Sequence, residues 1–424
     1  MLEKISQIWK IKDLRNKIVF VLAILVVFRL VAYIPVPGVD VTALRRFFES
    51  NQLLGLMNVF SGGTMQNFSV VMLGVGPYIT ASIIFQLLAM IVPSLEEMTK
   101  EGEAGQRRIN QYTRLLSVPL AFLQSYAMIM LLRQTGQGII TDLSLVRLIT
   151  SMITITAGTV FLMWLGELIS EKGIGNGISI LIFAGIISSL PQRLQQMAVT
   201  FDSSQLVQVI LYVAIAVVTI VGVVFVTEAQ RNIPVVYAKQ VRGNKVFGGS
   251  NTHLPLRVNM AGVIPIIFAI SIILFPPMVA QFFLRVKTAW ISHLAQGTIQ
   301  LFNNSIFYAA LYFLLVVAFT YFYTAVIFHP QKIAENLQKQ GGFIPGVRPG
   351  KTTAEYLQYI MNRILLASSV FLGAIAVLPL IVKSMTGSQS MVIGGTSLLI
   401  VVAVVIEIVK QVESQLTMRE YEQY

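Results

Sequence analysis

The chain of 424 residues contains no cysteine and only three histidines. Without cysteine it can form no disulfide, and it offers no thiol nucleophile or thiolate ligand for a metal ion. The histidines, His253, His293 and His329, stand far apart in the sequence, which argues against a histidine-rich metal site. We therefore expect no bound metal and no cofactor.

Charged residues are also scarce, at 12% of the chain, whereas hydrophobic residues make up 55%. A soluble domain has about twice that charged fraction, because its surface must be covered with polar groups. The composition therefore predicts a polytopic membrane protein.

Long hydrophobic runs are abundant. Most of them reach the roughly 20 residues that cross a bilayer as a helix. They predict an all-α protein with ten transmembrane helices at residues 18–36, 70–92, 115–132, 148–166, 178–190, 206–226, 260–280, 306–328, 364–382 and 391–409.

The placement of Lys and Arg predicts the orientation of these helices. If the N-terminus is cytosolic, 22 of the 31 Lys and Arg residues fall in cytosolic segments, eight fall outside and Arg29 lies within the first span. This bias indicates that both termini are cytosolic. The net charge of +12 is then mostly an orientation signal, to which attraction for anionic lipids also contributes.

Two shorter segments near the N-terminus have their own patterns. Residues 2–15 alternate apolar and basic side chains at helical spacing, which predicts an interfacial helix within residues 1–17. After PVPGVD ends the first helix, residues 53–69 are apolar but too short to span and are broken at Ser61-Gly62-Gly63. We expect a re-entrant half-helix in a cavity there, with an ordinary external loop as the alternative.

Two long, basic cytosolic loops interrupt the second half of the chain, at residues 227–257 and 329–363. In the first loop, IPVVYAKQ and KVFGG flank a turn and predict a β-hairpin. In the second loop, PQKIAENLQKQ predicts a helix that ends at Gly341-Gly342, and FIPGVRPG predicts a constrained turn that presents Arg348. Thr352 and Glu355 have capping-box spacing for a helix that continues into the ninth span. Basic loops of this size indicate a docking surface for something bulky.

No catalytic motif is present. Gly350-Lys351-Thr352 matches the end of a phosphate-binding loop, but Pro345 occupies the position of the required first glycine. We therefore expect a protein that is not an enzyme and takes its energy from a partner or a gradient.

Ionisable residues inside the spans would indicate an ion or proton pathway, but only Arg29 lies plainly within one. Glu167 and Glu407 fall at cytosolic ends, which argues against a small-ion pump. Milder polar residues do occur in the spans, and they either join helices by hydrogen bonds or serve a gate. They are Thr80, Gln86, Gln124, Ser125 and Asn259.

Several long stretches, in order along the whole chain, resemble the SecY family of protein-conducting channels in its bacterial form. They are FSGGTMQNFS, LGVGPYITASIIFQLL, EGEAGQRRINQYTR, FLMWLGELISEKGIGNGISILIFAGI, NTHLPLRVNMAGVIPIIFA, FIPGVRPGKTTAEYL and GGTSLLIVV. The resemblance implies two inverted five-helix halves around an hourglass pore. The first half would be residues 18–190, the second 206–410, and residues 411–424 a cytosolic tail.

The resemblance also implies roles for individual residues. An apolar pore ring would consist of Val75, Ile79, Ile178, Ile182, Ile267 and Ile400. A plug at about residues 55–68 would include Met57, Asn58, Val59, Phe60, Ser61, Gly62 and Gly63. A lateral gate between spans 2 and 3 on one side and spans 7 and 8 on the other would carry Thr80, Gln124 and Asn259. Val75 is smaller than the isoleucine usual in the ring.

The two basic loops match the family's docking sites for the SecA motor and for ribosomal RNA phosphates. The matching residues are Arg242, Lys245, Arg348 and Lys351, although Asn244 stands where the family commonly has a basic residue. The implied partners are SecE, SecG, SecA, the ribosome, secretory preproteins with their signal sequences, and anionic lipids.

The resemblance thus implies a channel in the bacterial plasma membrane. It would pass unfolded polypeptides across that membrane and release transmembrane segments sideways. One alternative is a small-solute secondary transporter with inverted repeats, which the missing mid-membrane acids disfavour. Another is a scaffold for cytosolic machines, which would need neither a plug nor an apolar ring.

Overall fold

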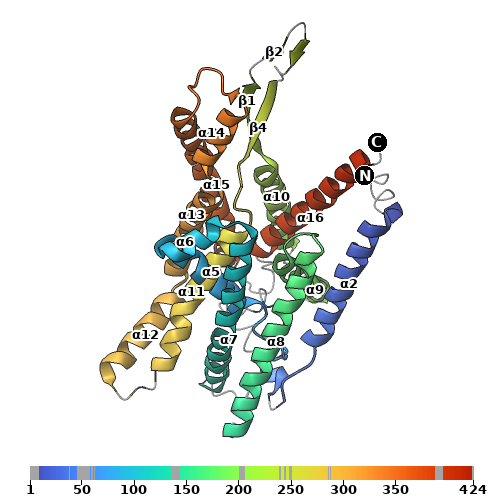
Figure 1. The fold of residues 1–424 in the computed structure, drawn as a ribbon. Helices are drawn as coiled ribbons and strands as arrows, with labels where there is room; N and C mark the ends of the chain where they lie inside the picture. Colours follow the sequence, from blue (N-terminus) through green and yellow to red (C-terminus); the bar gives the residue numbers. More distant parts are fainter. Residues whose placement is uncertain are drawn as a thin grey trace.

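A computed structural model describes residues 9–37, 39–44, 58, 61, 63–134, 144–199, 206–237, 240–242, 245–247, 251–284, 286, 288–386 and 395–422. These residues form a bundle of long helices with a small β structure at one end (Figure 1). The predicted all-α membrane class is confirmed, because the strands are confined to that end.

A helix overlaps each of the ten apolar windows. These helices are α2 (Lys12–Ala32), α5 (Gly76–Ile91), α7 (Glu103–Gln134), α8 (Leu145–Glu171), α9 (Gly177–Val199), α10 (Leu206–Glu228), α11 (Ile264–Phe283), α13 (Ser305–Ile327), α15 (Lys351–Thr386) and α16 (Gly395–Glu422). The described residues also form α6 (Pro93–Lys100), α12 (Ala289–Asn303) and α14 (Pro330–Lys339).

Within the described residues, five helical segments are long and apolar enough to cross a membrane. They contain α7, α8, α10, α13 and α15. Helices α5 and α6 are bent by 102° at Val92, and if they are counted as one broken span, six segments can cross a membrane. The apolar parts of α9 and α11 are shorter. The chain is therefore a multi-pass membrane protein.

The second predicted span, residues 70–92, is helical only from Gly76. The preceding residues turn repeatedly, because Gly74 adopts a φ of +58° that a helix cannot contain. Val75 then stands at the N-cap, and Pro77 lies in the first turn, where its missing N–H leaves no hydrogen bond unmade.

The interfacial helix predicted for residues 1–17 stays a prediction. Helix α2 begins at Lys12, after the extended residue Ile11, and runs without a break into the first span. Leu14 explains the continuity, since it is buried against Val412 and Leu416 of α16. Residues 1–8 lie outside the described part of the chain.

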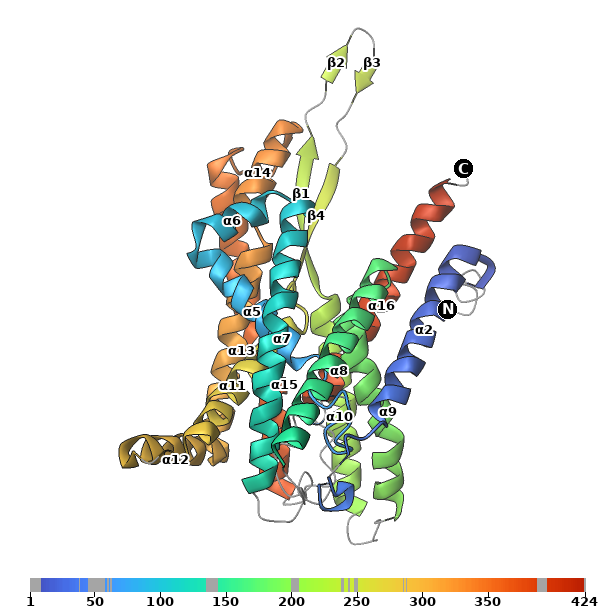
Figure 2. The same cartoon turned by 60° about the horizontal axis from the view of Figure 1, so that its bottom comes forward.

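The two basic loops form one folded unit. Strand β1 (Gln230–Tyr237) pairs antiparallel with β4 (Asn251–Arg257), and β5 (Gly342–Phe343) from the other loop pairs with the second edge of β1. Farther out, β2 (Gln240–Arg242) and β3 (Lys245–Phe247) form the predicted hairpin, which stands above the bundle in Figure 2. We call the unit formed by β1–β5, α14 and the first turns of α15 the platform.

The platform has its own apolar core, which joins the sheet to α14 and α15. Its buried residues are Ile233, Val235, Leu256, Phe328, Leu337, Ile344, Leu357, Ile360 and Met361. Because these side chains come from both loops, the loops cannot fold independently of each other.

The predicted elements of the second loop are confirmed except at one helix start. Helix α14 occupies the predicted segment and is followed by Gly341, whose φ is +70°. Helix α15 begins at Lys351, and the Gly350 carbonyl accepts its first hydrogen bond from the Ala354 N–H. Thr352 therefore lies inside the first turn, and the predicted capping box with Thr352 as N-cap is wrong.

Candidate functional site

The six predicted pore-ring residues meet in the main apolar cluster of the bundle. Ile178 is partly buried and packs against this cluster. The other five are at most 9% exposed; they are Val75, Ile79, Ile182, Ile267 and Ile400. Many other aliphatic side chains share the cluster, so burial alone does not distinguish the ring, which stays a prediction.

The composition of this cluster is what a barrier against water and ions would need. Its buried members come from helices in both halves of the chain, including α5, α9, α11 and α16, and none is charged. Aliphatic side chains at a constriction exclude water and ions because the space between them dewets. They also separate without breaking directional bonds, so such a seal can yield to a polypeptide.

The backbone before α5 positions Val75. The Val36 N–H donates to the Phe68 carbonyl (2.8 Å), and the Val70 N–H donates to the Ile34 carbonyl (2.9 Å). Phe68 is buried with a φ of +45°, a left-handed conformation that is costly for a bulky residue. Residues 63–75 are thereby tied to the stretch that follows α2.

The described part of the predicted plug is a buried polar turn. The Asn58 side chain accepts from the Gln66 N–H (3.1 Å) and donates to Gln66 Oε1 (2.9 Å). The Ser61 hydroxyl donates to the Asn58 carbonyl, and the Thr64 hydroxyl donates to the Ser61 carbonyl. Met57, Val59, Phe60 and Gly62 lie outside the described residues.

Thr64 and Gln66 lie within the predicted plug range, but the sequence did not single them out. Both are polar residues within an apolar stretch, and this was the available signal, because a polar group buried without a partner is costly. Gly63, the remaining predicted plug residue, donates its N–H to the Asn58 carbonyl (2.7 Å).

Residues 65–73, at the end of the predicted plug and just after it, pack against α7 and α8. Met65, Phe68 and Met72 are buried there with residues of both helices in a second apolar cluster. On α8, a Cβ added to Gly158 would lie 2.1 Å from the Val70 carbonyl oxygen. This close approach fixes the segment to the first half of the bundle.

The predicted lateral gate corresponds to the seam where α11 packs against α5 and α7. Two of the three predicted gate residues, Thr80 and Asn259, make local hydrogen bonds. The Thr80 hydroxyl donates to the Gly76 carbonyl (3.1 Å), and the Asn259 amide donates to the Gly262 carbonyl (3.3 Å). Asn259 Oδ1 is buried without a partner in this part of the chain, and Gln124 is partly buried on α7.

The seam between α11 and the two helices of the first half is therefore closed by packing. The predicted polar cluster stays a prediction, because no hydrogen bond among the described residues joins Thr80, Gln124 and Asn259 to one another. A seam held this way can open without leaving many broken hydrogen bonds.

The predicted docking residues all lie on the platform. Arg242 and Lys245 are paired in register at the outer end of the β2–β3 hairpin. Arg348 and Lys351 are exposed, and the Arg348 carbonyl accepts a hydrogen bond from the Thr353 hydroxyl (2.8 Å). The structure thus places these four cationic residues on one folded unit.

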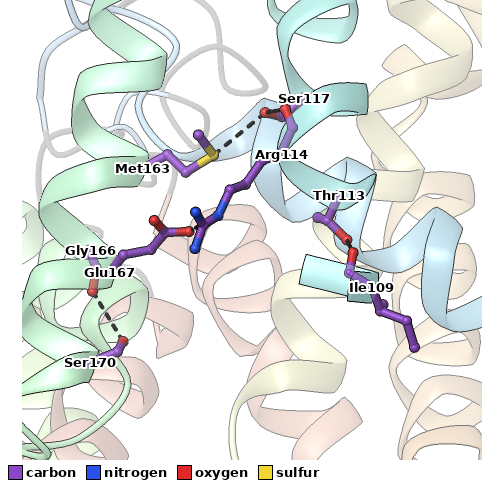
Figure 3. Close-up of polar contacts among 8 residues, drawn as sticks. All are labelled: Ile109, Thr113, Arg114, Ser117, Met163, Gly166, Glu167 and Ser170. Carbon is purple, nitrogen blue, oxygen red and sulfur yellow. Dashed lines mark hydrogen bonds and ion pairs between the residues drawn. The ribbon is translucent and has the colours of Figure 1, made fainter. Parts of the chain in front are cut away.

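A polar contact between α7 and α8 was missed at the sequence level. Arg114 Nε makes a short ion pair with Glu167 Oε1, and nearby the Ser117 hydroxyl contacts the Met163 sulfur at 3.6 Å (Figure 3). Arg114 immediately precedes the third apolar window, and Glu167 immediately follows the fourth. In adjacent antiparallel helices, the start of one helix lies beside the end of the other. Arg114 and Glu167 are therefore expected at the same level along the bundle, and their ion pair could have been predicted.

Arg29, expected within a span, lies in the last turn of α2. Its guanidinium lies 5.4 Å from the centre of the Tyr33 ring and 6.0 Å from that of Phe28. The helix ends four residues earlier than the apolar window, so this arginine is near the end of the span. It therefore does not mark an ion pathway.

The chain has close relatives of known family. The SecY family model matches residues 69–409. The protein translocase subunit SecY of Streptomyces galbus is 44% identical over 436 residues, which cover 100% of this chain and 99% of the relative.

Two solved structures share the fold. A protein-conducting channel aligns with a TM-score of 0.64 at 18% identity, over 93% of this chain and 91% of the channel. Sec61 in a canine ribosome–channel complex from the endoplasmic reticulum aligns with a TM-score of 0.61 at 17% identity, over 94% and 91% of the two chains. At such low identities these likenesses establish the arrangement of helices alone.

Proposed function

Because this chain belongs to the SecY family and is a protein-conducting channel subunit of the Sec translocase, we propose that its parts divide the work of translocation. The chain is a channel and not an enzyme. The aliphatic cluster of the bundle is the constriction, and the segment around residues 55–75 plugs it. The seam between α11 and helices α5 and α7 opens sideways to lipid, and the platform receives the driving partner.

One observation carries this proposal. Aliphatic side chains from both halves meet in a single cluster, and the seam between α11 and the first half is closed by packing. Such a construction separates to admit a chain and reseals afterwards. A carrier for small polar solutes would instead need polar groups at mid-depth to bind its substrate.

The platform supports the proposed docking of a motor or a ribosome. A SecA-type ATPase would push the chain, or a ribosome would deliver it, with Arg242, Lys245, Arg348 and Lys351 as contacts. Cationic side chains suit RNA phosphates as well as acidic protein surfaces. The Sec61 structure that shares this fold stands in a ribosome complex.

The remaining partners and the location follow from the same proposal. The protein resides in the bacterial plasma membrane with both termini and the platform in the cytosol. The start of α2, the end of α16 and the platform lie at one end of the bundle in Figure 2, which supports this orientation. SecE and SecG helices would cover part of the exposed apolar surface, of which α10 contributes Ile210, Val213, Val217, Val221 and Phe225.

Reconstitution tests the proposal directly. Proteoliposomes containing this protein and SecE, supplied with SecA, ATP and a secretory preprotein, are expected to protect the preprotein from external protease. Protection should disappear without ATP. If the preprotein stays accessible while the proteoliposomes take up a small solute, the channel assignment is wrong.

A further inference from the structure

Helix α12 (Ala289–Asn303) connects the gate helix α11 to α13, and the sequence did not predict it. It projects sideways at the end of the bundle opposite the platform (Figure 2). Its sequence, AWISHLAQGTIQLFN, contains no Asp, Glu, Lys or Arg. Five residues separate it from α11 and one separates it from α13, so it must lie close to the membrane surface.

One face of α12 packs against the bundle. Ala295 is buried, and Phe302 packs against the main apolar cluster. The Phe302 ring also meets the Phe307 ring of α13 edge-to-face, with 5.6 Å between their centroids. The Ser292 hydroxyl donates to the Leu284 carbonyl (3.1 Å), which ties α12 to the end of α11.

A second face carries large apolar side chains that no described residue covers. Trp290, Leu294 and Leu301 are 71%, 54% and 56% exposed. At 100° per residue they fall within about 40° of one another around the helix axis. Gln296 and Gln300, also exposed, lie about 140° and about 100° from the centre of this stripe around the axis.

A helix with an uncovered apolar stripe, a polar face and ends close to the bilayer matches an interfacial helix. The neighbouring ends of the flanking helices also carry exposed apolar side chains, Phe283 on α11 and Ile306 on α13. Tryptophan favours this depth, because its ring is largely apolar and its indole N–H can still reach headgroups.

We propose that α12 lies in the lipid interface of the leaflet opposite the platform. Trp290, Leu294 and Leu301 insert among the acyl chains, and Gln296 and Gln300 face water. Lipid is the occupant, because α12 lies between two apolar helices of the membrane-spanning bundle, α11 and α13, whose ends next to it also expose apolar side chains.

The anchor has a consequence for the gate. Since α12 is fixed to α11 by the Ser292–Leu284 hydrogen bond and by side-chain packing, lipid binding holds the outer end of α11 at one depth. When the seam opens, α11 is therefore expected to pivot about this end while keeping its depth. The anchoring itself is independent of whether the protein translocates polypeptides.

The absence of cysteine makes a clean test possible, because single-cysteine variants need no background substitutions. Leu294→Cys and the matched Gln296→Cys would each carry an environment-sensitive fluorophore in proteoliposomes of phosphatidylcholine and phosphatidylglycerol. The label at 294 is expected to emit at shorter wavelength, to lose intensity with nitroxide-bearing lipids and to resist aqueous iodide. The label at 296 is expected to show the reverse.

Two results would overturn the proposal. Equal quenching of both labels by iodide would place the whole helix in water. Protection of the label at 294 from iodide without quenching by nitroxide lipids would show that protein covers the stripe. A Trp290→Asp, Leu301→Asp double variant with the label at 294 provides a second measurement, and a several-fold rise in iodide quenching is expected.

Discussion

Arg348 lies on a turn whose backbone is fixed by hydrogen bonds. The Val347 N–H donates to the Ile344 carbonyl (3.0 Å), and the Arg348 carbonyl accepts from the Thr353 hydroxyl. The exposed guanidinium is thus presented on a fixed backbone, so docking orders the side chain but little of the turn. We predict that Arg348→Glu lowers SecA-driven translocation at least about tenfold, the equivalent of about 1.4 kcal/mol.

The control for Arg348 is Lys332→Glu, which makes the same charge reversal at an exposed position of α14 in the platform. Membrane assembly and thermal stability should be unchanged in both variants. Equal loss of transport in the two would mean that the platform acts through its net charge, and Arg348 would have no special role.

The Arg114–Glu167 pair joins two neighbouring helices, α7 and α8. The Glu167 side chain is 21% exposed and that of Arg114 is 45% exposed, so solvent screens the attraction only partly. Arg114→Ala leaves the half-buried carboxylate unpaired, and we predict a loss of about 1–2 kcal/mol in stability. The measurement is the unfolding midpoint in detergent micelles.

Arg107→Ala is the matched control on the same helix. Arg107 lies 3.8 Å from Glu103, and both side chains are almost fully exposed. Removing such a pair should change the midpoint little. A fall as large as that of Arg114→Ala would show that the inter-helix contact contributes nothing particular.

At the scale of elements, the glycine at position 105 controls the joint between α6 and α7. A Cβ there would lie 1.7 Å from the Met98 carbonyl oxygen, so a side chain forces the two helices apart. We predict that Gly105→Ala costs about 1–3 kcal/mol, as overpacking does elsewhere. Faster hydrogen exchange of the α6 amides would report the opened joint.

Gly297→Ala is the natural comparison, because this glycine also lies in a helix, α12, but no atom lies within 4 Å of its added Cβ. Alanine is the better helix former, so this variant should be unchanged or slightly more stable. If Gly105→Ala proved equally harmless, the close approach of α6 and α7 would be easily relieved.

Helices marked by a long apolar window were predictable from the sequence. A bend between two helices or a short connecting helix was not. All ten spanning windows overlap helices, because burial of about 20 apolar residues leaves few other structures possible. The bend at Val92 and the short helix α12 depend instead on local backbone geometry and on neighbours distant in sequence. A short amphipathic stretch such as 289–303 carries too weak a signal alone.

At the scale of the whole molecule, contacts between distant segments were the least predictable feature. The hairpin of the first basic loop follows from local turn chemistry, but its union with the second loop depends on β5, a strand of two residues. Likewise, the Lys410–Glu228 pair (2.8 Å) and the Gln415 bond to the Gly173 carbonyl (2.6 Å) tie α16 to α10 and to the turn before α9. Nothing in the separate segments specifies these partners.

The predicted pore ring would be a property of the whole molecule, because its residues come from both halves. Ile400 is fully buried in the main cluster, where a polar side chain would attract water into the seal. We predict that Ile400→Asn raises the ion conductance of the resting channel in planar bilayers. Ile155→Asn is the matched control, since Ile155 is equally buried but belongs to the cluster between α7, α8 and residues 36–73.

Both asparagine variants should lose stability, because each buries an amide that lacks hydrogen-bond partners, at a cost of about 1–3 kcal/mol. Only a variant in the constriction should leak ions, since dewetting fails there alone. Equal conductance in the two would mean that the leak comes from general loosening of the bundle, and the assigned ring would then have no support. A leak confined to Ile400→Asn places the seal at the contact between the two halves, where a translocating chain would have to pass.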